Sequence, residues 1–144
     1  HEGLRRYRIL EGVVETIAPE LGQPRAVLAH GGLVYYTLPK QGRVLRIISP
    51  DSFTPELVGD FSKLGVFLED LETDGEHLYL TVVTGDGPGL IARAPIAVGE
   101  VGGPVEVVVS GVGGQPSALV ADEGCVYWTE RESGSVFRAK KTPQ

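Results

Sequence analysis

The chain has 144 residues, a length that fits one domain with its own buried core. Hydrophobic residues make up 42% and charged residues 22%, a balance that argues against a disordered chain. The formal net charge of -6 disfavours nucleic acid as a partner, because affinity for a phosphate backbone comes mainly from clustered Lys and Arg. The apolar stretches fall well short of the ~18 residues of a membrane-spanning helix, so we expect no membrane insertion. The single cysteine, Cys125, excludes an intrachain disulfide.

Glycine and proline punctuate the whole chain. The 20 glycines and 10 prolines fall between short runs rich in Val and Tyr rather than in one tract, which predicts many turns and many short strands. Helical periodicity is weak, and short helical turns are expected only at residues 4–10 and 61–67. The fold class expected is therefore all-β. The abundance of Ala, Gly, Val, Pro and Arg is typical of a GC-rich bacterial gene.

The first expected element is a strand at residues 13–18. The segment "VVETIAPELGQP" from Val13 aligns with "VEVVVSGVGGQP" from Val105, so both segments should form the same kind of strand. Residues 1–12 are interpreted as an extension that begins at His1 in a processed or tagged N-terminus.

From residue 22 onward the sequence repeats itself three times. The repeats read "GQPRAVLAHGGLVYYTLPKQGRVLRI", "LEDLETDGEHLYLTVVTGDGPGLIARA" and "GQPSALVADEGCVYWTERESGSVFRAKK". Their tyrosines are spaced by 44 and 48 residues, and each is followed by a Gly-x-[VI]-x-Arg motif. These tyrosines and arginines are Tyr35, Tyr79 and Tyr127, and Arg46, Arg93 and Arg138. A period of ~40–50 residues with several strands in each repeat is typical of β-propeller blades.

Each repeat divides into strands that we name A to D. Strand A is expected at residues 26–29, 70–73 and 118–121, and strand B at 34–37, 78–82 and 126–129. Strand C is expected at 44–48, 90–94 and 136–139, whereas strand D follows only the first two repeats, at 56–58 and 105–109. The blades therefore span about 22–60, 66–110 and 114–141, within a propeller domain at 13–144. With the strand at 13–18, the predicted order is D, ABCD, ABCD, ABC.

The segments "VYWTERESGSVFRA", "VYYTLPKQGRVLRI" and "LYLTVVTGDGPGLIARA" resemble blades of the six-bladed YWTD and NHL-like propeller families. Those families repeat a Tyr-Trp-Thr-Asp-type strand, a turn and then Gly-x-[IV]-x-Arg. The third repeat, with Tyr127, Trp128, Thr129 and the acidic Glu130, is nearest to the full motif. The resemblance implies a β-propeller in which this chain supplies three blades.

Three blades do not close a ring, since propellers close with 4–8 blades. We expect two copies to form one six-bladed ring as a C2 homodimer, the commonest symmetry of homo-oligomers. The strand at 13–18 would complete the third blade of the other copy, which also covers an unpaired sheet edge. The residues expected to take part in this strand exchange are Val13, Val14, Thr16, Ile17, Val136 and Phe137. The alternatives are a segment of a longer propeller and a pairing with a different half.

The second A strand departs from the other two and suggests a site. It reads "DLET" where the others read "AVLA" and "ALVA". Asp70 and Glu72 are two residues apart and so share a strand face, and Asp74 follows them. Because strand A is innermost in a blade, these carboxylates are candidates for a channel site that holds a cation or a basic group. The alternative interpretation is a solvated channel wall.

Two classes of function remain. The first is a non-enzymatic module whose D–A and B–C loops bind a protein, peptide or glycan. The candidate loop residues are Arg25, Lys40, Gln41, Asp86, Glu130 and Arg131. The second is a propeller enzyme of the lactonase or streptogramin-lyase-like type, with a metal or acid/base site in the central channel. The sequence contains no nucleophile motif and no clear ligand set, so we expect no catalytic residue, metal or cofactor.

Overall fold

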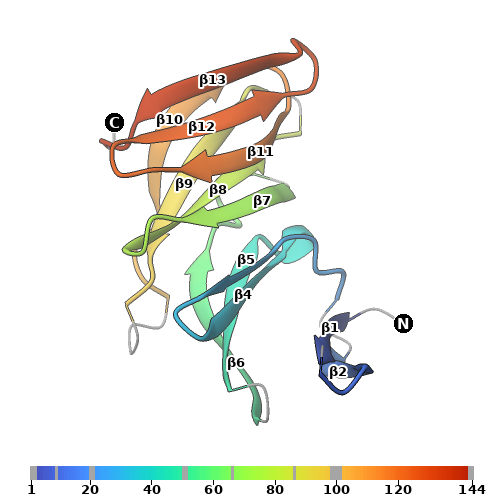
Figure 1. Ribbon diagram of the computed structural model, residues 1–144. Helices are drawn as coiled ribbons and strands as arrows, with labels where there is room; N and C mark the ends of the chain where they lie inside the picture. Colours follow the sequence, from blue (N-terminus) through green and yellow to red (C-terminus); the bar gives the residue numbers. More distant parts are fainter. Residues whose placement is uncertain are drawn as a thin grey trace.

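The structure is a computed structural model that describes residues 3–8, 10–19, 22–49, 52–65, 67–85, 87–97 and 102–142. Its strands form three antiparallel sheets and one two-stranded hairpin (Figure 1). The first sheet contains β3 (Val27–His30), β4 (Leu33–Leu38), β5 (Arg43–Ser49) and β6 (Ser52–Asp60). The second contains β7 (Phe67–Thr73), β8 (His77–Val83), β9 (Gly89–Pro95) and β10 (Glu106–Val112). The third contains β11 (Pro116–Ala121), β12 (Cys125–Glu130) and β13 (Ser135–Lys140).

Within each sheet the strands follow one another in chain order, and every neighbouring pair is antiparallel. A 3-10 turn, η1 (Pro39–Gln41), separates β4 from β5 and ends at Gly42. Gly42 has φ 64°, and a Cβ at this position would lie 2.6 Å from the Cα of Ser62. The turn therefore requires glycine for both its conformation and the close approach of the neighbouring chain.

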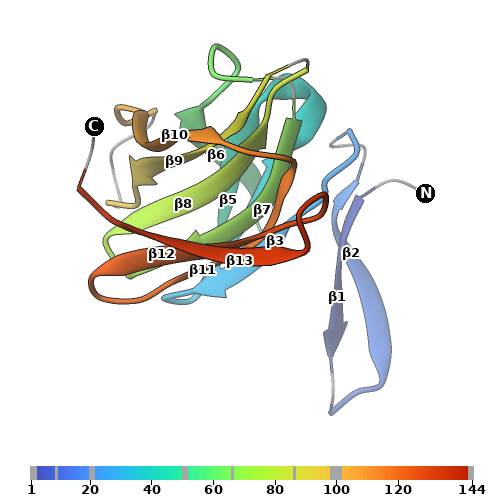
Figure 2. The ribbon, with the colours of Figure 1, turned by 90° about the horizontal axis from the view of Figure 1, so that it is seen from above.

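The remaining two strands, β1 (Gly3–Arg8) and β2 (Val13–Pro19), form a hairpin at one side of the three sheets (Figure 2). The helical turn expected at residues 4–10 is wrong for the described part of that segment, because residues 4–8 belong to β1. The strand expected at 13–18 lies within β2. Hydrogen bonding to β2 decides the conformation of residues 3–8, which carry little apolar pattern of their own.

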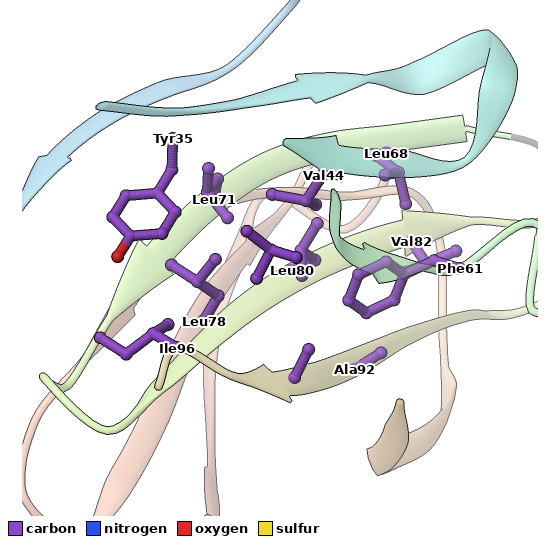
Figure 3. Packing of buried hydrophobic residues seen from close by; sticks show 12 residues of the cluster. Tyr35, Val44, Phe61, Leu68, Leu71, Leu78, Leu80, Val82, Ala92 and Ile96 are labelled. Atoms are coloured by element: carbon purple, nitrogen blue, oxygen red, sulfur yellow. The ribbon is translucent and has the colours of Figure 1, made fainter. Parts of the chain in front are cut away.

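The main core lies between the first and second sheets (Figure 3). Tyr35 and Val44 of the first sheet join a buried cluster with Leu71, Leu78 and Leu80 of the second. A second cluster joins the second and third sheets. Each interface buries large side chains on both sheets, at about 1.5–3 kcal/mol for each fully buried aliphatic or aromatic group. Packing between sheets thus supplies most of the hydrophobic stabilisation.

The hairpin covers part of the opposite face of the first sheet. Ile17 of β2 packs there with Tyr36, Leu38 and Ile47. The Tyr36 hydroxyl is buried and has no hydrogen-bond partner among the described residues, and burial raises the pKa of Tyr36 to about 12. A buried hydroxyl without a hydrogen-bond partner costs free energy. The packing of the hairpin on the first sheet therefore carries a penalty from its unpaired polar group.

The repeated threonine of strand B joins strands A and B of each sheet. Its Oγ1 accepts a hydrogen bond from the backbone N–H of the residue 11 positions earlier. The pairs are Thr37 with Ala26 at 3.0 Å, Thr81 with Asp70 at 2.9 Å, and Thr129 with Ala118 at 3.1 Å. These bonds give a structural reason for the third residue of the Tyr-x-Thr pattern.

The repeated arginine joins a sheet to the next one along the chain. Arg46 is fully buried, and its Nε and Nη2 donate to Oε2 of Glu56 at 3.0 and 2.9 Å. Its Nη1 donates to the carbonyl oxygens of Ile96 and Ala97, beyond the third strand of the second sheet, at 3.3 and 3.2 Å. Arg46 therefore bridges the outer strand of its own sheet and the backbone of its neighbour.

Arg93 repeats this arrangement one sheet later. Its Nε donates to Oε2 of Glu106 at 2.8 Å, and its Nη1 donates to the carbonyl oxygen of Lys141 at 3.1 Å. The same side chain in the same place thus links the second sheet to the third.

Asp74 forms a further link between the second and third sheets. Its Oδ2 accepts from Nζ of Lys141 at 2.6 Å and from the hydroxyl of Tyr79 at 2.9 Å. Its Oδ1 accepts from the backbone N–H groups of Glu76 and His77 at 3.0 and 2.9 Å. Burial alone would raise the pKa of Asp74, but the hydrogen bonds from Lys141, His77, Glu76 and Tyr79 outweigh it and hold the pKa well below its usual range.

Replacing Arg46 by Met should lower the free energy of unfolding by about 3 kcal/mol, because Glu56 and two carbonyl groups lose a buried donor. The control is Arg43→Met on the same strand, which removes only the exposed contact to Asp60 and should cost less than about 1 kcal/mol. Urea unfolding followed by the fluorescence of Trp128 measures both. Equal losses in the two variants would contradict the bridging role of Arg46.

Stability should fall on acidification, and Asp74 should carry part of that fall. A carboxyl group whose pKa is lower in the folded state stabilises the fold above its unfolded pKa of about 4. That stabilisation is lost as the pH decreases toward the folded pKa. Asp74→Asn should therefore be less stable than the wild type at pH 7 but lose less stability between pH 5 and pH 2. Thermal unfolding of both proteins at several pH values tests this. If the unfolding temperatures of the variant and the wild type fall in parallel as the pH decreases, Asp74 does not contribute to the loss of stability.

Candidate functional site

Three charged side chains from the three sheets meet at one end of the molecule. Arg25 precedes β3, Glu69 lies on β7, and Arg131 follows β12. Oε1 of Glu69 accepts hydrogen bonds from Nη2 of Arg25 and, at 2.7 Å, from Nη2 of Arg131. One carboxylate oxygen thus holds two guanidinium groups that are far apart in the sequence.

The two arginines of this cluster are the accessible part. The Glu69 side chain is only 10% exposed, whereas Arg25 is 41% and Arg131 is 59% exposed. The Arg25 guanidinium also lies 5.2 Å from the centre of the Phe67 ring, which orients it further. A guanidinium carries five N–H donors, and the contact to Glu69 uses one nitrogen of each. Both arginines line an open hollow.

This hollow has a volume of about 410 Å³, and its lining includes Arg25, Glu69, Asp70, Ser117 and Arg131. Both of its carboxylates are already hydrogen bonded. Glu69 accepts from the two arginines, and Oδ2 of Asp70 accepts from the backbone N–H of Leu119 at 2.8 Å. The hollow therefore places two guanidinium groups beside two carboxylates that each accept hydrogen bonds through one oxygen.

The structure separates the three carboxylates of the channel site that was expected from the sequence. Asp70 and Glu72 share a face of β7, as expected, but that face lies opposite Thr81 and Tyr79 of β8 and is turned toward the third sheet. Oε1 of Glu72 accepts from the N–H of Thr73 at 2.8 Å. Asp74 lies beyond the far end of the strand, in its contact with Lys141 and Tyr79. The three carboxylates therefore have different hydrogen-bond partners, and the structure does not bring them together as one group.

The candidate loop residues also separate into groups. Arg25 and Arg131 belong to the cluster around Glu69. Lys40 and Gln41 line a different hollow of about 240 Å³ beside η1. Asp86 lies outside the described residues.

Glu130 differs from the expectation of an exposed loop residue, because its side chain is buried. Its Oε1 accepts from Nε1 of Trp128 at 3.4 Å, and its Oε2 accepts from the hydroxyl of Ser133 at 3.2 Å. Alternation along β12 turns Glu130 to the same side as Val126 and Trp128, toward the second sheet. It supports the turn that carries Arg131 and is not available to a partner.

The residues expected to exchange strands lie in two separate sheets. Val13, Val14, Thr16 and Ile17 belong to β2, whose described partner is β1. Val136 and Phe137 belong to β13, the outer strand of the third sheet. The two strands are far apart within one chain (Figure 1).

Glu69 was not among the residues selected from the sequence, although it organises the cluster. Its signal was weak, since one acidic residue just ahead of the "DLET" strand resembles ordinary surface charge. Across the described residues, we find no group of three or more His, Cys, Asp or Glu side chains placed to hold a metal ion. The described part of the chain also contains no helix long and apolar enough to cross a membrane.

No protein-family model matches the chain, and no curated protein sequence matches it. Solved structures do match. Virginiamycin B lyase from Staphylococcus aureus aligns with a TM-score of 0.62 and 14% identity, over 94% of this chain and 47% of the lyase chain. A chain of the nidogen/laminin complex aligns with a TM-score of 0.54 and 17% identity, over 99% of this chain and 70% of that chain. This chain thus spans about half the length of the lyase, and at these identities the likeness concerns the fold alone. The protein therefore has an all-β fold that resembles a β-propeller.

Proposed function

We propose that this chain is a non-enzymatic binding module of the β-propeller type, which uses Arg25 and Arg131 to bind an acidic segment of a protein partner. The observation that carries this proposal is the pair of partly exposed guanidinium groups held by Glu69 at the edge of the hollow. A guanidinium group pairs with carboxylates through two parallel N–H donors, which gives both affinity and orientation. Because Glu69 already fixes both arginines, a partner loses less side-chain entropy on binding them.

The chemistry of the hollow favours binding over catalysis. A general base needs an available proton acceptor, whereas one oxygen of each carboxylate, Oε1 of Glu69 and Oδ2 of Asp70, already accepts hydrogen bonds within the protein. The structural neighbours include an enzyme, the lyase, and a propeller in complex with another protein, nidogen with laminin. Exposed arginines agree better with binding to another protein than with catalysis.

The proposal includes a six-bladed ring made of two copies, each supplying its three sheets as blades. The second sheet uses one face to contact the sheet before it and the other to contact the sheet after it. The third sheet has no following sheet among the described residues, and the first is preceded only by the hairpin. A second copy would supply both missing neighbours. Strand exchange through β2 and β13 would join the copies.

Binding to the arginines can be tested with a fluorescein-labelled oligoglutamate peptide and fluorescence polarisation at low salt. Arg131→Glu should weaken binding at least about tenfold, because it replaces an attractive contact by a repulsive one. The control Lys140→Glu makes the same charge change at the far end of β13 and should have an effect of less than about twofold. Equal weakening by both variants would indicate general charge attraction and refute a site at Arg131.

The assembly state can be measured directly by light scattering at micromolar concentration. The dimer should have twice the 15.4 kDa mass of the chain. A single species of 15.4 kDa across the concentration range would refute the two-copy ring.

A further inference from the structure

The β1–β2 hairpin has the same register as the last two strands of each complete sheet. An arginine on the first strand is opposite a glutamate on the second in all three cases. The pairs are Arg6 with Glu15, Arg46 with Glu56, and Arg93 with Glu106. The residue two positions after each glutamate has no partner in the register and is buried. These residues are Ile17, Val58 and Val108. By its register, β1 therefore corresponds to strand C of a sheet, and β2 corresponds to strand D.

Strand β13 has the residues of a C strand but has no D strand beside it within the described residues. Its Gly-x-[VI]-x-Arg motif places Val136 and Arg138 where the second sheet has Ile91 and Arg93. Arg93 has its salt bridge to Glu106 on β10, whereas Arg138 is exposed and has no salt bridge within the described residues. The outer edge of β13 is the position that a D strand occupies in the other sheets.

The two unpaired faces of the chain match each other. Val136 is 73% exposed, whereas its equivalents Val44 and Ile91 are 0% exposed under the next sheet. At the other end, Val27 is 58% exposed, whereas its equivalents Leu71 and Leu119 are 5% and 4% exposed against the preceding sheet. In both sheet-to-sheet interfaces of this chain, the face equivalent to that of Val136 packs against the face equivalent to that of Val27. A second copy therefore carries the complement of each exposed face.

An apolar hollow marks where a neighbouring sheet would lie. Its volume is about 330 Å³, and its lining includes Leu4 and Ile17 of the hairpin with Val27, Val34 and Ile47 of the first sheet. In register the hairpin supplies only the two outer strands of a sheet. The hollow lies over the first sheet where two inner strands, equivalent to β11 and β12, would pack.

We infer that β13 pairs with β2 of a second copy, and that β1 occupies the place of β13 on β2 until that copy binds. The repeated register predicts Arg138 opposite Glu15, Phe137 opposite Thr16 and Val136 opposite Ala18, with Ile17 as the extra residue. This inference depends on the two-copy ring proposed above. It adds that the hairpin must open, since β1 and β13 both require the same edge of β2.

A disulfide that locks the hairpin tests this inference in the full chain. Tyr7 and Val14 are paired across β1 and β2, and both side chains are exposed. In a Cys125→Ser background, Tyr7→Cys with Val14→Cys should be dimeric when reduced and monomeric when oxidised. Addition of dithiothreitol should restore the dimer. Tyr7→Cys alone in the same background is the control and should stay dimeric under both conditions.

Each outcome has a distinct meaning. A locked hairpin that remains dimeric would refute the competition between β1 and β13 but leave the two-copy ring intact. A wild-type chain that is monomeric would refute the ring itself. As an independent check of register, Thr16→Cys with Phe137→Cys should cross-link two copies on oxidation, and the absence of a covalent dimer would refute this pairing.

Discussion

The first and second sheets of this protein each depend on the next sheet to cover one face, and this constraint organises the rest of the structure. Tyr35 and Tyr79 occupy the same place in successive sheets, and each is buried in a cluster with residues of the following sheet. The bridging arginines and Asp74 reinforce these interfaces from their rims. An apolar sheet face left open to water forfeits its burial free energy, so both ends of the array are places where further contacts are favoured.

The short apolar runs, together with the repeat, were enough to locate the strands from residue 13 onward. The segments expected around Tyr35, Tyr79 and Tyr127 lie within β4, β8 and β12, because the central strand of each sheet has a strong apolar pattern. Residues 3–8 were missed as a strand for the opposite reason. Their conformation comes from hydrogen bonding to β2 rather than from their own composition. The resemblance to propeller repeats agreed with the fold of the structural neighbours.

The site was less predictable, since it depends on contacts between repeats. Arg25 and Arg131 were selected as loop residues, but their convergence on Glu69 follows from three sheets meeting at one end. Glu130 was assigned to a loop because it precedes a turn, although strand alternation turns its side chain inward. Asp70 appeared free in the sequence because its partner, the N–H of Leu119, belongs to another repeat. A one-dimensional pattern does not show which carboxylates are already occupied.

The repeated threonine also explains where the repeats differ in length. The interval between the N–H donor on strand A and the threonine on strand B is 11 residues in all three sheets. The interval from the tyrosine to the arginine is 11, 14 and 11 residues, so the segment between strands B and C does vary. An insertion in the first interval would move the hydroxyl away from its donor, whereas an insertion in the second only lengthens a turn. Added residues should therefore be tolerated more readily between strands B and C, as in the second repeat, than between strands A and B.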